Sequence, residues 1–236
     1  MSELSPKDFA FLQRRWMTLW EDTLGESRFQ TLTQNYSDPL RKYHTLAHIL
    51  DGFLVLDQAH LSLSPFEQRI FDLAWWYHDA VYDVKCKDNE ERSATLMNRE
   101  CAAAKFQNEG IISTAESLIL ATRHATPPIT FLQKVMVDVD LSILGGEKEV
   151  YRTYARAICE EYAVIVPEAP YRAGRAAFMK RFEGKPPYHL ARFIGLYGER
   201  AIENVSEEIA FLNGSLPLEE FFSGNKTADI PLGPRD

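Results

Sequence analysis

Apolar side chains recur along most of the chain at the three- and four-residue spacing of an amphipathic helix. Phe9, Leu12 and Trp16 show this spacing near the N-terminus. With caps, prolines and glycines taken as the helix ends, we predict about nine helices, over residues 5–20, 45–61, 65–81, 88–106, 113–124, 131–144, 147–166, 171–182 and 194–222.

No segment alternates between apolar and polar residues as a half-buried strand would, and no repeat or long linker divides the chain. We therefore expect an all-α fold with a single domain over residues 1–222. From Ser223 the composition turns polar with glycine and proline, so residues 223–236 are expected to form a flexible tail.

The helix predicted at 65–81 is the most apolar in the chain. Ser64 and Glu67 form a capping box around Pro65, which marks its start. Its apolar residues cover most sides, and such a helix is normally buried.

Composition limits the class of protein. The chain has 236 residues, of which 45% are hydrophobic and 25% charged, as in ordinary globular domains. Its net charge of -8 argues against general binding of nucleic acid or anionic membranes, which requires a basic surface. The helical pattern is compatible with a homo-oligomer but does not specify one.

The cysteines and the N-terminus favour a cytoplasmic protein. Cys86, Cys101 and Cys159 are odd in number and lack metal-site spacing, so we expect free thiols in a reducing compartment. The first residues show no signal-peptide pattern, and the longest apolar run, Leu73 to Tyr77, is far too short to span a membrane.

The informative polar residues are those that interrupt apolar helices. His78 and Asp79 end the most apolar helix, where an ionised carboxylate is costly unless it is paired or bound to a cation. Asp138 and Asp140 interrupt a valine-rich helix in the same way.

Besides these carboxylates, a pair of histidines offers nitrogen ligands for a metal. His44 and His48 are four residues apart, which would place them on one face of a helix. Imidazoles and carboxylates that project from facing helices suit a divalent ion: manganese, iron, cobalt, nickel, zinc or magnesium.

Four segments contain these residues in order. They are Tyr43-His44-Thr-Leu-Ala-His48-Ile, Trp76-Tyr77-His78-Asp79-Ala-Val-Tyr82-Asp83, Asp88-Asn89-Glu90-Glu91-Arg92-Ser93-Ala94 and Asp138-Val-Asp140-Leu-Ser-Ile-Leu-Gly145. Together they resemble the HD-domain superfamily of metal-dependent phosphohydrolases, and more narrowly a bacterial branch whose substrate is not established. The resemblance implies a helical bundle with its metal-site core at about 43–145.

The resemblance also implies the ligands. One early histidine, the His-Asp pair and a late aspartate map onto His48, His78, Asp79 and Asp140. His44 is a rival for the first position and Asp138 for the last. Cyclic-nucleotide phosphodiesterases, distant relatives, have a similar Tyr-His-x-x-x-His stretch in which the second histidine binds metal and the first protonates the leaving group. On that analogy His44 is the general acid.

Further residues are candidates for supporting roles. Asp83 is expected to orient a ligand histidine, as carboxylates around metal sites often do. His124 is a candidate contact to a second metal or a phosphate. Asn89, Glu90, Ser93 and Arg175 are candidate substrate contacts, although capping of a helix and a solvated helix face are the alternatives.

The implied function is hydrolysis of a phosphate ester of a small metabolite, with a nucleotide as one candidate. A metal ion would activate water and stabilise charge on phosphorus, and Asp79 would also steer that water. Two alternatives stay open: a non-catalytic module that binds metal or a nucleotide, and an HD-type di-iron oxygenase, which requires more histidine ligands. Substrate and metal identity are not encoded in any short motif.

Overall fold

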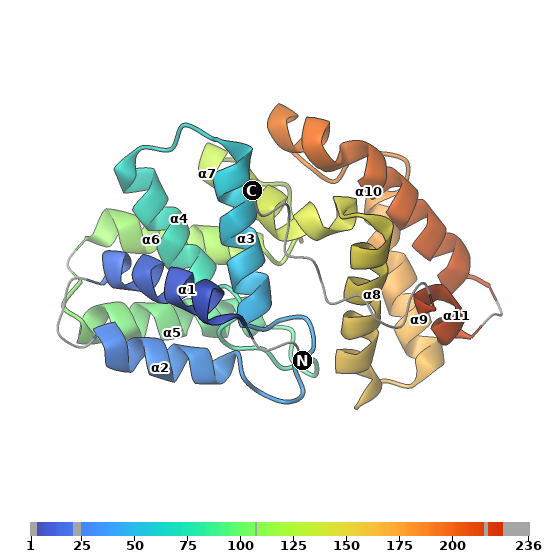
Figure 1. Ribbon diagram of the computed structural model, residues 1–236, viewed down its shortest axis with the longest axis horizontal. Coiled ribbons are helices and arrows are strands. Elements are labelled where there is room, and N and C mark those ends of the chain that lie inside the picture. Colours follow the sequence, from blue (N-terminus) through green and yellow to red (C-terminus); the bar gives the residue numbers. More distant parts are fainter. Residues whose placement is uncertain (1–3, 21–24, 107, 215–216, 224–236) are drawn as a thin grey trace. The chain divides into compact units, whose positions relative to one another are not determined.

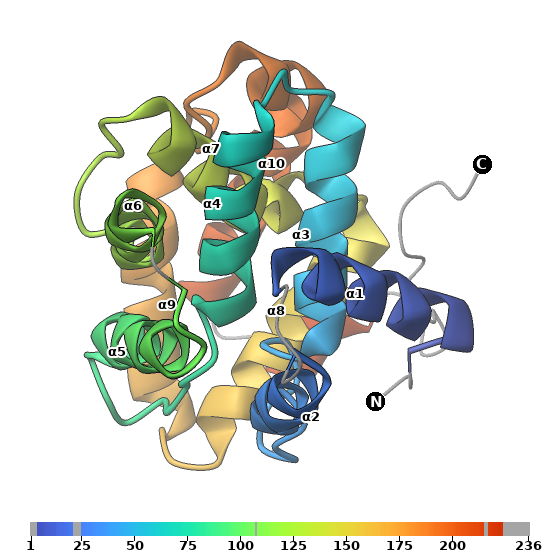
Figure 2. The same cartoon turned by 90° about the vertical axis from the view of Figure 1, so that its left-hand side faces the viewer.

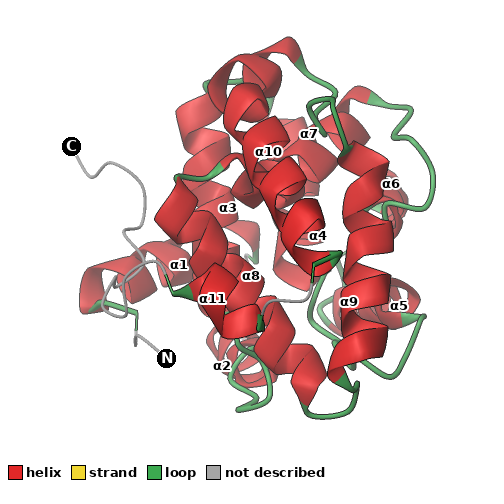
Figure 3. Ribbon diagram, turned by 90° about the vertical axis from the view of Figure 1, so that its right-hand side faces the viewer, coloured by secondary structure: helices red, strands yellow, loops and turns green. Residues whose placement is uncertain are grey.

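A computed structural model describes residues 4–20, 25–106, 108–214 and 217–223 (Figure 1). Within these ranges the chain forms eleven α-helices and two short 3-10 helices (η1 and η2), and no strand (Figure 3). The all-α prediction is therefore confirmed. Residues 224–236 of the expected flexible tail lie outside the described part.

The helices have the following bounds. They are α1 Pro6–Leu19, α2 Gly25–Asn35, α3 Leu46–Ala59, α4 Pro65–Tyr77, α5 Asn89–Ala103, α6 Glu109–Ala121, α7 Phe131–Asp140, η1 Leu141–Gly145, α8 Lys148–Ala163, α9 Glu168–Met179, η2 Lys180–Phe182, α10 Ala191–Leu212 and α11 Leu218–Phe222.

The expected count of about nine helices is too low for two reasons. Gly25–Asn35 forms α2, although only Phe29 and Leu32 give it large buried apolar side chains, too few for a clear periodic pattern. The helix expected at 194–222 ends instead at Leu212, two residues before Gly214, which disfavours a continuing helix, and a separate helix, α11, begins at Leu218 after Pro217.

The chain divides into two compact units, Met1–Val137 and Asp138–Asp236, with the boundary inside α7. The prediction of one domain over 1–222 stays a prediction, and each unit is described separately. None of the described helices has both the length and the apolar run needed to cross a bilayer. All three cysteines are free thiols, as expected.

In the first unit α4 is the central helix: it contacts α1, α3, α5 and α6 (Figure 2). The predicted capping box is present, since Ser64 accepts from the backbone of Glu67 and the Glu67 carboxylate accepts from the backbone of Ser64. Trp75 and Trp76 are fully buried. The Tyr36 hydroxyl donates to the Trp76 carbonyl at 2.8 Å, which ties the segment after α2 to the end of α4.

In the second unit α10 packs against η1, α8 and α9. Its polar core is an ion pair between Arg175 of α9 and Glu208 of α10, at 2.9 Å between Nε and Oε1. The Tyr151 hydroxyl donates to the same carboxylate, and Arg175 donates to the Tyr154 hydroxyl. These buried polar groups therefore satisfy one another.

Gly52 of α3 allows the indole of Trp75 to pack against the helix backbone, because an added Cβ would lie 1.9 Å from Trp75 Cζ2. Gly52→Ala is therefore expected to lower the free energy of unfolding by about 1–3 kcal/mol, the usual cost of overpacking. Gly174 of α9 is the matched control, with no atom within 4 Å of an added Cβ. There alanine should stabilise by about 0.5–1 kcal/mol. Urea unfolding measures both; a stabilised Gly52→Ala would contradict the packing.

Candidate metal centre

Two buried imidazoles meet between α3 and the end of α4. His48 lies in the first turn of α3, which Thr45 caps by accepting from the Ala47 backbone. His78 follows the last residue of α4. Their Nε2 atoms are 3.1 Å apart, and the residues are only 4% and 1% exposed.

The tautomer of His78 is set by its other nitrogen. Nδ1 lies 2.8 Å from the Trp75 carbonyl oxygen, which can only accept, so Nδ1 bears the proton. In neutral His78 the lone pair of Nε2 therefore faces His48. A hydrogen bond from the second ring nitrogen to a backbone carbonyl is the usual arrangement for a metal-binding histidine.

The spacing of the two nitrogens suits ligands of one ion. Adjacent ligands with bonds of about 2.1 Å in tetrahedral or octahedral geometry lie roughly 3.0–3.4 Å apart. The Nε2 atoms of His48 and His78, at 3.1 Å, fall in this range. The Trp75 ring holds both imidazoles, stacking on His78 at 4.3 Å and lying 5.1 Å from the His48 ring.

Asp79 brings a carboxylate to the same point. Its Oδ2 is 3.1 Å from His78 Nε2 and 3.6 Å from His48 Nε2. Burial raises the pKa of the Asp79 carboxyl, but positive charge on His78 and then on His44, when their imidazoles are protonated, outweighs it and holds the pKa below its usual value. The group is thus held as an anion, the form in which it binds a metal.

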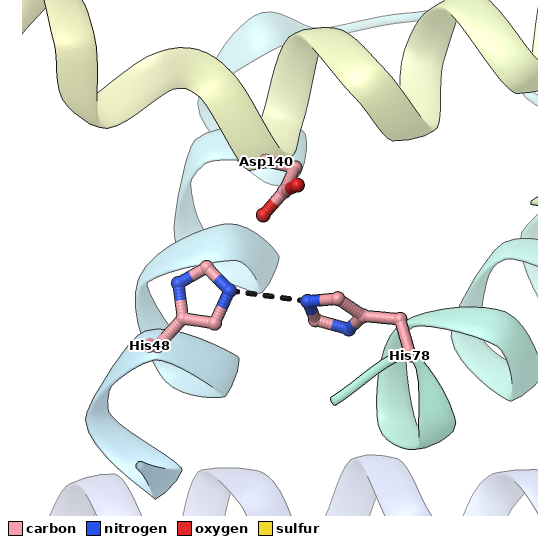
Figure 4. A group of neighbouring side chains, drawn as sticks. All are labelled: His48, His78 and Asp140. Atoms are coloured by element: carbon pink, nitrogen blue, oxygen red, sulfur yellow. Dashed lines mark hydrogen bonds between the residues drawn. The ribbon is translucent and has the colours of Figure 1, made fainter. Parts of the chain in front are cut away.

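Asp140, the last residue of α7, completes the group. His48, His78 and Asp140 each offer a ligand atom, and these atoms lie within 4.8 Å of one another (Figure 4). Two nitrogens and a carboxylate oxygen at this separation could hold a metal ion.

Asp138 has a different role. It is fully buried, and its two carboxylate oxygens accept from the backbones of His189 and Leu190, each at 2.8 Å. Leu190 is the N-cap of α10, so Asp138 satisfies backbone donors at the start of that helix. Of the two aspartates, Asp140 is the one grouped with the histidines.

Comparisons with models of protein families, with curated proteins and with solved structures found no match for this chain. The HD resemblance of the sequence segments therefore stays a prediction.

His44 is close to this group but not on the same helix as His48. The expected shared face is wrong, because α3 begins at Leu46 and His44 precedes the cap. The two rings are nevertheless 6.0 Å apart between centroids. Positive charge on the His44 imidazole lowers the pKa of the Asp79 carboxyl.

The orienting contact of Asp83 with a ligand histidine stays a prediction, and the Nδ1 of His78 faces the Trp75 carbonyl. The Asp83 carboxylate accepts from the Lys85 backbone at 2.9 Å and from the Cys86 thiol. Asp83 therefore shapes the turn that follows the His-Asp pair.

Asn89 and Ser93 hold the same loop to α5. The Asn89 side chain exchanges two hydrogen bonds with the Asp83 backbone, each at 3.0 Å. The Ser93 hydroxyl accepts from the Val81 backbone N–H and donates to its carbonyl. For both residues the contact with a substrate stays a prediction.

Three further candidates lie in different surroundings. Burial raises the pKa of the Glu90 carboxyl, and the charge of Asp79 raises it further. His124 follows α6 with a left-handed backbone, φ 52°, and is outside the metal group. Arg175, in the second unit, has its guanidinium occupied by Glu208 and Tyr154.

Arg41 is a site residue that sequence reasoning missed. It is 4% exposed and donates to the carbonyls of His44 at 3.1 Å, Asp79 at 2.7 Å and Ala80 at 3.2 Å. No pattern distinguished it, because an arginine beside a lysine in a polar segment normally lies at the surface.

Proposed function

We propose that this protein is a metal-dependent phosphohydrolase of the HD type that cleaves a phosphate ester of a small metabolite. The meeting of His48, His78 and Asp140, with the Asp79 carboxylate close to both imidazoles, supports the proposal most strongly. A divalent ion bound by these side chains would lower the pKa of a coordinated water and offset charge on the phosphoryl oxygens.

The protein's own groups would do the remaining work. Asp79, held as an anion, would orient the attacking water by accepting a hydrogen bond from it. His44 would donate a proton to the leaving oxygen, a role suited to an imidazole because its ordinary pKa is about 6.5. The His44 ring lies 6.0 Å from that of His48 between centroids, and this proximity to the proposed ligands supports the assignment.

His44→Ala separates proton donation from metal binding. We expect the variant to keep its metal and to lose turnover by about 100- to 10,000-fold, the usual contribution of general acid catalysis. The measurements are metal content by mass spectrometry and hydrolysis of phosphomonoesters, phosphodiesters and nucleotides by the metal-loaded protein. His60→Asn is the control: it removes an exposed imidazole at the end of α3, and asparagine tolerates the left-handed backbone there.

Two outcomes would change the proposal. If His44→Ala empties the site, His44 is a ligand and the roles of the two histidines are wrong. If the wild-type protein holds its metal but hydrolyses none of these esters, the non-catalytic binding module becomes the better account. The di-iron oxygenase requires a second set of ligands, and the described residues bring together one.

A further inference from the structure

The His44 ring is packed between two tyrosines of the first unit. Tyr82 stacks on it with ring centroids 4.1 Å apart and an angle of 29° between the planes. Tyr43 meets it edge-on at 5.1 Å and also lies 4.8 Å from the His48 ring. Besides Tyr43, its neighbour in the sequence, the His44 imidazole therefore contacts a second aromatic ring, that of Tyr82.

Tyr82 is itself held by Arg41. The guanidinium carbon lies 5.5 Å from the Tyr82 ring centroid and 5.1 Å from that of Tyr36. Cation–π contacts of this length are attractive and favour a fixed ring orientation.

Arg41 also connects the two backbone segments that contain the stacked rings. Its bonds to the carbonyls of His44, Asp79 and Ala80 span the loop before α3 and the loop after α4. Tyr82 lies two residues beyond Ala80, in the second of these loops. One buried guanidinium thus fixes both the backbone of His44 and the segment that holds its aromatic partner.

We propose that Tyr82 is a positioning residue that fixes the His44 imidazole near His48, with Arg41 holding Tyr82 in place. Only the catalytic consequence of this positioning rests on the proposed function. A proton donor is needed most when the leaving group is a poor one, so the position of His44 should matter for alkyl esters and little for aryl esters.

The ring position is testable without turnover. In the metal-free protein, NMR signals of the His44 ring, assigned by their absence from His44→Ala, should be shifted upfield by the stacked Tyr82. Tyr82→Leu should move these signals toward the values of a free imidazole, whereas Tyr82→Phe, which keeps the ring, should leave them near their wild-type positions. Unchanged His44 signals in folded Tyr82→Leu would overturn the proposal.

The catalytic consequence is tested with two esters, p-nitrophenyl phosphate and a primary alkyl phosphate. Tyr82→Leu should lower kcat for the alkyl ester by about 10- to 100-fold, as expected for a misplaced catalytic group, with a much smaller change for the nitrophenyl ester. Metal content should stay at the wild-type level, and Tyr82→Phe should retain most activity on both esters.

Equal losses on both esters, or loss of metal, would show that Tyr82 acts only as packing. Thermal melts of the metal-free variants establish that each is folded. If Tyr82→Leu does not fold, Tyr82→Met, which also removes the ring and has a similar volume to leucine, is used in its place. If the wild-type protein hydrolyses no phosphomonoester, phosphodiester or nucleotide, the proposed function fails, and the NMR comparison still decides whether Tyr82 positions His44.

Discussion

Replacing His78 by alanine is expected to lower the affinity of the chain for a divalent cation by more than about 100-fold. Loss of a group that only orients a ligand usually lowers metal affinity by about 10- to 100-fold, so a larger loss indicates a direct ligand. We expect the larger loss because His78 Nε2 lies 3.1 Å from both His48 Nε2 and Asp79 Oδ2, at the point where the ligand atoms converge. Calorimetric titration of the metal-free protein with Mn²⁺ and Ni²⁺ measures the change.

The control for this prediction is again His60→Asn, which removes an exposed imidazole and should bind as tightly as wild type. Thermal melts of the metal-free proteins establish that His78→Ala remains folded. If folded His78→Ala binds both ions with wild-type affinity, the metal lies elsewhere or the site does not exist.

Glu208→Ala is expected to have the largest effect on stability, about 3–5 kcal/mol, because it leaves the charge of Arg175 buried without its partner. The Nε and Nη2 atoms of Arg175 donate to the Glu208 carboxylate at 2.9 and 3.2 Å. The side chain of Arg175 is 7% exposed and that of Glu208 is 3% exposed. Urea unfolding at neutral pH, followed by circular dichroism, measures the loss.

The neighbouring residue provides a matched control. Glu207 of the same helix pairs with Arg152 at 2.9 Å, but its side chain is 38% exposed. Since exposed pairs contribute about 0–1 kcal/mol, Glu207→Ala should change stability little. The double variant Arg175→Met/Glu208→Leu should recover much of the loss, because it removes both charges together. Equal losses for Glu207→Ala and Glu208→Ala would contradict this account of the second unit.

Features set by neighbours in sequence could be predicted. The capping box at Ser64 and the apolar surface of α4 depend on residues a few positions apart, and the structure has both of them. His78 and Asp79 stood out for a related reason: polar groups that end a buried helix need a partner.

Features set by contacts distant in sequence could not be predicted. Asp138 and Asp140 have similar flanks, and the contact of Asp138 with the backbone of His189 and Leu190, some fifty residues later, is not encoded in them. Arg41 is buried next to the site because it donates to three carbonyls from two loops. No local sequence pattern predicts these contacts. The helix α2 was missed because its stability depends on packing against α1 rather than on its own apolar pattern.

Titration of the metal-free protein with Co²⁺, followed by visible absorption, tests the central claim most directly, because the bands report the ligands of the bound ion and the saturation point counts the sites. We expect saturation at one ion per chain in the wild type and no such signal in folded His78→Ala. A wild-type protein that shows no saturable signal, or a His78→Ala variant that shows the same signal, would contradict a metal centre at His48, His78, Asp79 and Asp140.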